Sequence, residues 1–333
     1  MIKILIFATM PPPIGGVSVH IERFLHFSKD YQDKVNIDVY DIKKRKLNGI
    51  NSEKKGILIL FYSFLSADII HIHISNNFKI LIALIAKLFR KRVVYTHHNS
   101  RVNHPKIFKY MTQLSDKIIL VNDKEIDLKL LDRKKIEHIP AFLPPFEFKE
   151  LPTFLNKKIE ESTFVISTNC FKYTLLNNKD LYGFDLIIEA YSSFITSPNI
   201  KNTLLIIVDP SGTTQEYVAS CIKKYPLINE NNFLYVSEKI DFVSLVRKSH
   251  LTIRATRSDG DSLSVRESLY LGIPIIASDV TYRPKGTILF QNENVKSLEE
   301  EILKVYSHQT VISEQDNQNF ATKIIALYQK IKN

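Results

Sequence analysis

The residues best suited to chemistry lie between Asp259 and Glu267, two carboxylates that stand eight positions apart. A short apolar run that ends near Ala255 predicts a strand before them. Gly272 followed by Pro274 predicts the end of a helix after them, because glycine and proline commonly terminate helices. The two carboxylates are therefore expected to flank the junction between a strand and a helix.

The residues Gly260, Asp261, Ser262 and Leu263 fill this junction. Free backbone amides at a helix N-terminus attract phosphate groups and hydroxyls. Glu267 would lie about one turn into the helix and point back to the same pocket. The spacing therefore suits a site in which carboxylates accept hydrogen bonds from the hydroxyls of a sugar and of a ribose.

The elements that must position this site alternate between strands and helices. Continuous apolar strands that alternate with helical periodicity are typical of parallel sheets covered on both faces. The pattern predicts an α/β fold with two tandem, doubly wound, Rossmann-like domains and a cleft between them. The predicted strands are Ile4–Ala8, Val35–Tyr40, Ile69–Ile72, Val93–Thr96, Ile118–Val121, Ile136–Ile139, Phe164–Thr168, Leu204–Val208, Phe233–Val236, Leu251–Ala255, Ile273–Ala277 and Thr287–Phe290. The predicted helices are Val17–Phe27, Phe78–Phe89, Glu125–Leu131, Phe184–Phe194, Gln215–Lys224, Phe242–Lys248, Val265–Leu271 and Asn319–Ile331.

The segment Pro140–Pro152 interrupts the alternation. Its four prolines cannot lie inside a helix or a central strand, so we interpret it as an interdomain linker. The expected domains are an acceptor-side domain over 1–150 and a nucleotide-sugar-binding domain over 151–312. The segment 313–333 is expected to form a helix that packs back toward the first domain.

The composition is that of an ordinary globular protein, with 44% hydrophobic and 24% charged residues in 333. The two cysteines, Cys170 and Cys221, have no ligand-like spacing, which fits a reducing, cytoplasmic compartment. No uncharged run reaches the roughly 18 residues that a membrane span requires. The N-terminal run Met1–Phe7 is interpreted as a buried strand and not as a signal segment, because three prolines and two glycines follow it.

Positive charge is concentrated in the first half of the chain. Residues 1–160 contain 27 Lys and Arg against 16 Asp and Glu, whereas the whole chain has a net charge of +10. Runs such as 43–46, 90–92 and 133–135 favour an anionic partner, and a peripheral position at the inner face of a membrane is one possibility. A solvated lysine-rich surface is the alternative. Aromatic residues are not interleaved with the basic runs, so nucleic acid is not expected as a partner.

The stretch from Asp259 to Ser278 resembles the signature of glycosyltransferase family 4, a family of retaining enzymes with the two-domain GT-B fold. In that signature an acidic residue is followed by Gly, by Glu eight positions later, by Gly-x-Pro and by Ala-Ser. The resemblance implies that Asp259 contacts the donor sugar and that Glu267 binds the ribose. It also implies that residues 260–263 supply backbone contacts to the diphosphate and the sugar.

Other motifs with the same resemblance follow in the family's order along nearly the whole chain. Gly15-Gly16 resembles an N-terminal loop that meets the diphosphate and the acceptor. Residues 67–73 resemble an Asp-Val-Val-His-Val-His strand, and Thr96-His97-His98 resembles a strand end that places His98 beside the donor sugar. Tyr182-Gly183-Phe184-Asp185 resembles a helix start that opens Lys-Gly-x-Asp.

The sequence departs from this family where the diphosphate should be neutralised. The family's Arg after the first strand of the second domain is replaced by the stretch 167–170, and Tyr182 replaces its Lys. Arg257 and Arg266 are the cations expected to bind the donor, although salt bridges on a solvated face would explain them equally well. The full set of candidate cations is Lys172, Lys179, Arg254, Arg257 and Arg266.

Each candidate residue also has a simpler interpretation. Asp259 and Asp261 could ligate a divalent metal as an Asp-x-Asp motif, or could serve only as turn and capping residues. Glu267 could merely complement the helix dipole, and Gly15-Gly16 could merely allow a tight turn. His71 and His73 point to one face of a strand, so with His97, His98 and His104 they suggest zinc, although half-buried strand ends are favoured.

The resemblance implies transfer of a sugar, with retention, from a nucleoside-diphosphate sugar to a saccharide or a lipid-diphosphate-linked saccharide in surface polysaccharide synthesis. No cofactor and no metal are expected, because basic groups and helix dipoles can stabilise the leaving diphosphate. Two alternatives remain. One is a nucleotide-sugar epimerase on the same fold, and the other is a non-catalytic subunit that binds the donor.

Overall fold

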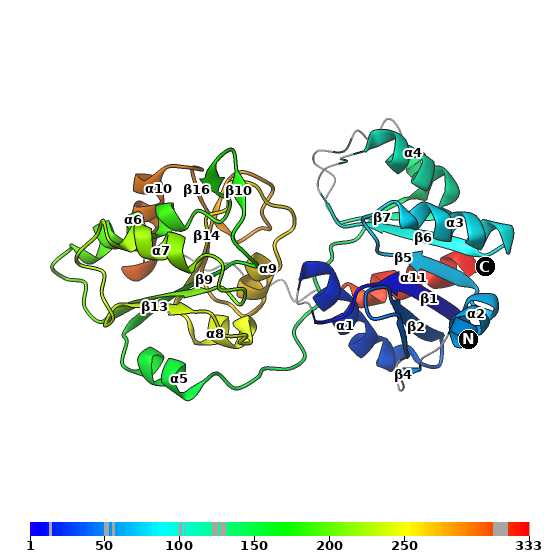
Figure 1. Cartoon of the computed structure of the whole chain (residues 1–333), viewed down its shortest axis with the longest axis horizontal. Helices are drawn as coiled ribbons and strands as arrows, with labels where there is room; N and C mark the ends of the chain where they lie inside the picture. The colour runs from blue at the N-terminus through cyan, green and yellow to red at the C-terminus, as the bar shows by residue number, and fades with distance from the viewer. Residues whose placement is uncertain are drawn as a thin grey trace. The chain divides into compact units, whose positions relative to one another are not determined.

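The computed structural model describes residues 1–12, 15–49, 53–54, 57–99, 102, 104–121, 126, 131–308 and 319–332. The chain divides into two compact units, the first formed by residues 1–146 with 318–333 and the second by residues 147–317 (Figure 1). The division falls within Pro140–Pro152, which has neither helix nor strand. Among the described residues, no helix combines the length and the apolar character that crossing a bilayer requires.

The first unit is built on an eight-stranded sheet with the order β4-β3-β2-β1-β5-β6-β7-β8. The strands are β1 (Ile2–Ala8), β2 (Val35–Asp41), β3 (Lys46–Gly49), β4 (Glu53–Lys54), β5 (Ile69–Ile72), β6 (Arg92–His97), β7 (Lys117–Leu120) and β8 (Ile136–His138). All neighbours pair in parallel except β2–β3 and β3–β4, which are antiparallel. The six predicted strands of this half are therefore confirmed, and the β3–β4 hairpin was not predicted.

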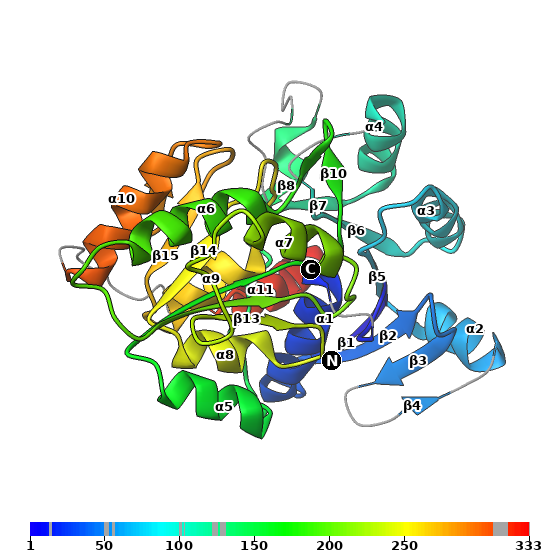
Figure 2. The same ribbon diagram turned by 60° about the vertical axis from the view of Figure 1, so that its left-hand side comes forward.

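Helices cover both faces of this sheet. They are α1 (Gly16–Ser28), α2 (Ile57–Ser66), α3 (Phe78–Leu88), α4 (Pro105–Leu114) and α11 (Ala321–Lys332), with short 3-10 turns η1 (Lys29–Tyr31) and η3 (Arg133–Lys135). Figure 2 shows α2, α3 and α4 along one face and α1 and α11 along the other. The predicted helix Glu125–Leu131 lies largely outside the described residues.

The second unit has a six-stranded, fully parallel sheet with the order β13-β12-β9-β14-β15-β16. The strands are β9 (Phe164–Asn169), β12 (Thr203–Val208), β13 (Phe233–Val236), β14 (Leu251–Arg254), β15 (Ile275–Ser278) and β16 (Ile288–Phe290), with a separate hairpin of β10 (Leu175–Leu176) and β11 (Lys179–Asp180). The helices are α5 (Thr153–Glu160), α6 (Phe184–Ile195), α7 (Gln215–Ile222), α8 (Phe242–Lys248), α9 (Leu263–Tyr270) and α10 (Val295–Tyr306).

The core of the second unit explains its apolar strands. β9, β12 and β14 are buried along almost their whole length, and β12 is buried at every position. Strands covered on both faces must be apolar throughout, which is why they appear in the sequence as continuous apolar runs. The two units are thus both α/β layers, in agreement with the predicted fold class.

The order of strands sets where a ligand can bind in each unit. From the central strand β9 the chain first builds outward through β12 and β13, and then returns to build β14, β15 and β16 on the other side. In open parallel sheets, ligands bind beyond the carboxyl ends of the strands where this reversal occurs. In the second unit that position lies between the ends of β9 and β14.

Candidate functional site

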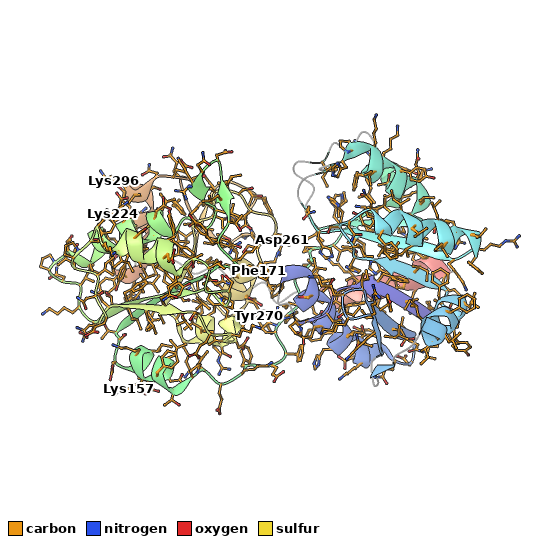
Figure 3. All side chains as sticks on the ribbon, viewed as in Figure 1. Lys157, Phe171, Lys224, Asp261, Tyr270 and Lys296 are labelled. Carbon is orange, nitrogen blue, oxygen red and sulfur yellow. The ribbon has the colours of Figure 1, made fainter. Side chains whose placement is uncertain are left out.

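The loop that follows β14 places the predicted carboxylates at this position. β14 ends at Arg254 and α9 begins at Leu263, so Asp259 and Asp261 both lie in the connecting loop. Ser262 is the N-cap residue of α9. Figure 3 labels Asp261 in this loop and Phe171 in the loop that follows β9.

Asp259 is bound by two arginines. Arg254 donates from Nε to Oδ2 at 3.0 Å and from Nη2 to Oδ1 at 3.2 Å, and Arg283 donates from Nη1 to Oδ2 at 2.8 Å. The Thr256 hydroxyl and the Gly260 amide donate to the same carboxylate. A carboxylate has about four lone-pair positions, so these five hydrogen bonds fill its acceptor capacity.

The charge of Asp259 is fixed by this environment. The side chain is 9% exposed, and burial alone would raise the pKa of its carboxyl group. The charges and hydrogen bonds of Arg254 and Arg283 outweigh burial and hold that pKa well below its usual range. Asp259 is therefore ionised at neutral pH.

Asp261 differs from Asp259 in having an oxygen without a partner. Its Oδ1 accepts from Arg266 Nε at 2.5 Å, and its side chain is 8% exposed. Its Oδ2 is buried and accepts no hydrogen bond from any residue that the structure describes. Burial raises the pKa of Asp261, with a further contribution from Asp259, despite the nearby Arg266. A buried polar atom without a partner is costly, so it marks a place where a ligand could complete the hydrogen bonding.

Arg257, one of the two arginines expected to bind the donor, is bound by acidic residues of three other segments of the second unit. Its guanidinium donates two hydrogen bonds to Asp185 at 3.0 and 2.8 Å and one to Glu293 at 3.2 Å, and it also donates to the Asp180 carbonyl oxygen. The side chain is only 4% exposed. These contacts join α6, the β10–β11 hairpin and the loop after β16, and the donor-binding role of Arg257 stays a prediction.

Arg283 is the residue of this site that sequence reasoning missed. It lies in the loop after β15, donates from Nε to the Ser278 carbonyl oxygen at 3.1 Å, and has a side chain that is 2% exposed. It stands 24 positions after Asp259, and no motif connects the two residues. Only the parallel pairing of β14 with β15 brings their loops together.

Of the other candidate cations, Arg254 lies at the end of β14, whereas Lys179 and Lys172 lie in segments that precede α6. Arg254 lies at the carboxyl end of β14, with its guanidinium 5.4 Å from the centre of the Tyr182 ring, and its side chain is 16% exposed. Lys179 pairs with Glu293 at 2.6 Å in the β10–β11 hairpin. Lys172 is exposed in the loop after β9. Arg254 is thus the candidate cation that lies directly at the point where the strand order reverses.

Gly183 is required for the close approach of α6 to β14. Its φ is +69°, and a Cβ at this position would lie 2.2 Å from the Ala255 carbonyl oxygen. Asp180 accepts from the amides of Tyr182 and Phe184 and so fixes the start of α6. The backbone at Gly183 and the hydrogen bonds of Asp180 thus position the Tyr182 ring, whose centre lies 5.4 Å from the Arg254 guanidinium.

Glu267 lies in α9 and is 4% exposed, so it is buried in the second unit next to the candidate loop.

Gly260 has nothing within 4 Å of the place where a Cβ would stand, so packing does not demand glycine there. The space beside Gly260 is consistent with close approach of a ligand to the backbone.

The first unit brings three of the predicted histidines, His71, His73 and His98, together with His20 near its own strand reversal between β1 and β5. His97 instead contacts Tyr95 and Phe108, and His104 is exposed at the start of α4. His73 Nδ1 lies 2.8 Å from His98 Nε2, and His71 Nδ1 lies 2.5 Å from the Tyr328 hydroxyl of α11. His71 Nε2 lies 2.7 Å from the Thr96 hydroxyl, and His20 Nδ1 lies 2.6 Å from the Ala141 carbonyl oxygen. Within the described part of the chain, no group of three or more His, Cys, Asp or Glu is arranged to hold a metal ion.

Burial keeps these imidazoles neutral. It lowers the pKa of His20 to about 4 and that of His71 to about 3, and it lowers the pKa of His73 and His98 well below 6.5. His73 Nε2 also lies 3.4 Å from His71 Nδ1, so His98, His73, His71 and Tyr328 form one chain of polar contacts in which His71 Nδ1 is shared by His73 and Tyr328. This chain anchors His98 to the C-terminal helix of the same unit.

Gly15 and Gly16 lie at the start of α1 in this unit. The Gly15 amide donates to Ser18 Oγ at 2.9 Å, and α1 begins at Gly16. Gly15 has extended backbone angles, and a Cβ at Gly16 would meet nothing within 4 Å. Neither glycine is required by local packing, so their predicted role at the diphosphate stays a prediction.

Comparisons with known proteins agree with this architecture. HepE of Anabaena in complex with UDP is 13% identical, with a TM-score of 0.66 over 100% of this chain and 96% of that chain. A glycosyltransferase of Rickettsia africae is 16% identical, with a TM-score of 0.67 over 99% and 93%. The lipopolysaccharide outer core galactosyltransferase WaaB is 14% identical, with a TM-score of 0.64 over 99% and 100%. The chain has the GT-B fold.

The second unit of this GT-B chain also has a sequence match. Residues 176–328 match the family model described as Glycosyl transferases group 1. That segment contains the arginine-bound Asp259, Asp261, Glu267 and Arg283, whereas the histidine cluster lies before it, apart from Tyr328. In a search of curated proteins, none matches the chain.

Proposed function

We propose that this chain is a retaining glycosyltransferase that transfers a sugar from a nucleoside-diphosphate sugar to a saccharide. The observation that carries the proposal is the loop between β14 and α9, where two arginines share Asp259 and a buried oxygen of Asp261 faces no partner among the described residues. The family-model match over residues 176–328 supports a transferase of this class.

The charges of the loop favour a diphosphate as one part of the ligand. Three guanidinium groups, those of Arg254, Arg266 and Arg283, stand against the carboxyl groups of Asp259 and Asp261. With both carboxyl groups ionised, one positive charge remains uncompensated, at the carboxyl edge of a parallel sheet and beside a helix N-terminus. We assign the diphosphate contact to Arg254, because its side chain is 16% exposed whereas that of Arg283 is 2% exposed. In this proposal Arg254 takes the place of the diphosphate-binding Arg and Lys of the family, which this sequence lacks at the expected positions.

The two aspartates then have different roles. Because its five hydrogen bonds fill its acceptor capacity, Asp259 positions the two arginines and does not contact the sugar. Asp261 Oδ2 accepts a hydrogen bond from a sugar hydroxyl, which removes the cost of its unpaired burial. Glu267 binds the ribose, residues 260, 262 and 263 line the diphosphate, and Arg266 orients Asp261. We retain His98, Gly15 and Gly16 of the first unit as predicted donor-site residues, and we propose that no metal takes part.

The first experiment is a thermal-shift panel of UDP, GDP, ADP and their sugars, since a bound ligand raises stability by mass action. HepE was solved with UDP and with UDP-glucose, so the uridine compounds come first. We expect one nucleotide to raise the melting temperature of the wild type and the Arg254→Gln variant to lose that shift. If no nucleotide stabilises the wild type, the proposal fails.

A second measurement separates the transferase from the two alternatives. Purified protein is incubated with the selected nucleotide sugar, with and without a saccharide or lipid-diphosphate-linked saccharide acceptor. Transfer that requires the acceptor supports the proposal. Epimerised sugar in the absence of any acceptor would indicate an epimerase, and binding without turnover with every acceptor would indicate a non-catalytic donor-binding subunit.

The cellular setting is proposed on chemical grounds. Nucleoside-diphosphate sugars and reduced cysteines both occur in the cytoplasm. Cys170 and Cys221 are free and buried. An acceptor carried on a lipid diphosphate would place the enzyme at the inner face of the membrane, in surface polysaccharide synthesis. The positive charge of residues 1–160 would favour that location.

A further inference from the structure

Helix α2 presents large apolar side chains to solvent. The ten residues Ile57–Ser66 contain no charged residue. Leu58 is 79% exposed, Tyr62 71% and Phe61 54%, whereas Ser63 and Phe64 are buried. A surface helix normally places polar residues on its outer face, and a helix that is apolar all round is normally covered. The outer face of α2 therefore has the composition of a buried surface.

Helix α3 repeats this pattern. Its inner face buries Ile82, Ala83 and Ala86 against the sheet. Its outer face exposes Leu81, Leu84, Ile85 and Leu88, at the i, i+3, i+4, i+7 spacing of a single helical stripe. Leu88 is 79% exposed. This helix has two apolar stripes, of which the core uses only one.

The two exposed faces belong to one surface. α2 and α3 cover the same face of the sheet (Figure 2), and their C-terminal ends meet. The Phe64 ring packs edge-on against the Phe89 ring at 6.0 Å, and Lys91 Nζ donates to the Leu65 carbonyl oxygen at 2.5 Å. We name this surface the apolar helix face, and its residues are Leu58, Phe61, Tyr62, Leu65, Phe78, Leu81, Leu84, Ile85, Leu88 and Phe89.

This clustering is not the usual scatter of exposed apolar residues. Of the nineteen large apolar side chains that are exposed in the described residues, ten lie on the apolar helix face, within residues 58–89. Single exposed apolar residues need no explanation, but a contiguous group marks an interaction surface. The apolar helix face is therefore expected to be covered by a partner.

Basic residues border this surface at its C-terminal end. Arg90, Lys91 and Arg92 follow Phe89 directly in sequence, and Lys332 of α11 joins them around a depression. Phe89, Ala67 and Asp68 complete its lining. Lys332 pairs with Asp68 at 2.5 Å and Arg92 pairs with Asp116 at 3.6 Å, so the four cations outnumber these two carboxylates. Cations beside an apolar surface match the anionic headgroups that lie above the hydrocarbon of a membrane.

We propose that the apolar helix face docks on an anionic lipid surface, with Arg90, Lys91 and Arg92 at the level of the phosphates. Tyr62 and Phe61 would lie in the interfacial layer, and the aliphatic stripe of α3 would enter the acyl boundary. A second copy of the chain is the alternative partner, and we favour a lipid surface because the cations at the border of this face match anionic headgroups. The proposal does not depend on the transferase function, since lipid binding needs no donor.

The surface differs from the basic run 43–46, which the sequence alone suggests as a membrane contact. Lys44 pairs with Asp41 at 3.9 Å and donates to the Pro11 carbonyl oxygen, so part of that charge is used within the unit. None of the large exposed apolar residues in the described part of the chain falls between residues 43 and 46. Lipid binding is therefore expected to depend far more on the apolar helix face than on this run.

The absence of tryptophan from the chain allows a direct test. The single variants Tyr62→Trp and Leu88→Trp each place one fluorophore on the apolar helix face, and Leu227→Trp places one at a 52% exposed position of the second unit. With vesicles of phosphatidylcholine and about 30% phosphatidylglycerol, emission from positions 62 and 88 should shift to shorter wavelength and be quenched by brominated lipid. Emission from position 227 should not change.

Sedimentation with the same vesicles tests the surface by removal. The combined variant Phe61→Ser, Leu84→Ser and Leu88→Ser should lower vesicle partitioning by on the order of tenfold or more, because large apolar side chains no longer enter the bilayer. The control Phe154→Ser, Leu227→Ser and Leu289→Ser changes the same residue types at exposed positions of the second unit, which are 44%, 52% and 51% exposed, and should bind as the wild type does. Replacing residues 43–46 by alanine should have a smaller effect than Arg90→Gln with Arg92→Gln.

Three results would overturn the proposal. One is a wild-type protein that does not bind the anionic vesicles at low salt. Another is binding that the combined variant retains in full, with a circular dichroism spectrum like that of the wild type. The third is a wild-type dimer in light scattering that the same variant converts to a monomer, because this would assign the surface to a second copy of the chain.

Discussion

Asp259 and Asp261 should respond in opposite ways to the same substitution. Asp259→Asn removes the charge that holds Arg254 and Arg283, but leaves one oxygen and the size of the side chain. Asp261→Asn removes the charge of a buried carboxyl group whose Oδ2 has no partner in the described structure. We expect the first change to act mainly on the stability of the second unit and the second to act mainly on turnover.

The size of the stability effect follows from burial. The side chains of Asp259 and Arg283 are 9% and 2% exposed, so the substitution leaves a guanidinium charge buried without its counter-charge. Breaking a buried pair in this way costs about 3–5 kcal/mol. For a unit of this size, each kcal/mol lowers the melting temperature by roughly 2–4 °C, so a fall of about 10 °C is expected.

Asp261→Asn should cost about 1 kcal/mol of stability or less, because the amide oxygen can still accept from Arg266. Its effect on the reaction should be larger. A hydrogen bond to a charged group contributes about 1.5–3 kcal/mol, which corresponds to a loss of roughly 10- to 100-fold in kcat/KM for the donor.

The stability effect of Asp259 should also depend on pH. Because the folded structure lowers the pKa of this carboxyl group, its contribution is present above the unfolded pKa of about 3.9. The contribution is lost as the pH falls through the folded value. The difference in melting temperature between the wild type and Asp259→Asn should therefore be full at pH 7 and should shrink below about pH 4.

Differential scanning fluorimetry and initial rates, measured on both variants, test this reasoning together. A low melting temperature for Asp259→Asn and a low rate for Asp261→Asn would support the division of roles. If Asp259→Asn instead kept the wild-type melting temperature and lost turnover, while Asp261→Asn stayed fully active, Asp259 would be the sugar contact that the family resemblance implies.

Other substitutions test the remaining parts of the site. Glu267→Gln should abolish transfer while thermal unfolding stays near that of the wild type, because the amide keeps the size of this buried side chain, and an active variant would refute the ribose assignment. Gly183→Ala should destabilise the second unit by about 3 kcal/mol in urea unfolding, because its φ is +69° and the new Cβ would lie 2.2 Å from the Ala255 carbonyl oxygen; Gly260→Ala is the control. His20 and His71 are buried and neutral, with their pKa values lowered from 6.5 to about 4 and about 3, so the first unit should lose stability as the pH falls from about 6.5 towards 4. Combining His20→Gln with His71→Gln should flatten this slope in a melting-temperature series, and an unchanged slope would contradict the argument.

Local pattern predicted most of the parallel sheets. The continuous apolar runs that became β5, β9 and β12 are visible without any tertiary information, because a strand covered on both faces has to be apolar at every position. Four helices, α2, α4, α5 and α10, were not predicted. α2 lacks the polar outer face that makes a helix recognisable, and that same feature is the basis of the proposed lipid surface.

The sequence by itself determined that a strand ends and a helix begins around Asp259, Asp261 and Glu267, since glycine, serine and proline mark such junctions locally. Only the tertiary structure decided which residues donate hydrogen bonds to Asp259 and Asp261. Arg283 donates to Asp259 because β14 and β15 pair in parallel and bring their loops together. Arg257 donates to Asp185 and Glu293, which lie far from it in sequence. Hydrogen-bond partners depend on which loops the sheet brings together, and the spacing of residues along a chain does not contain that information.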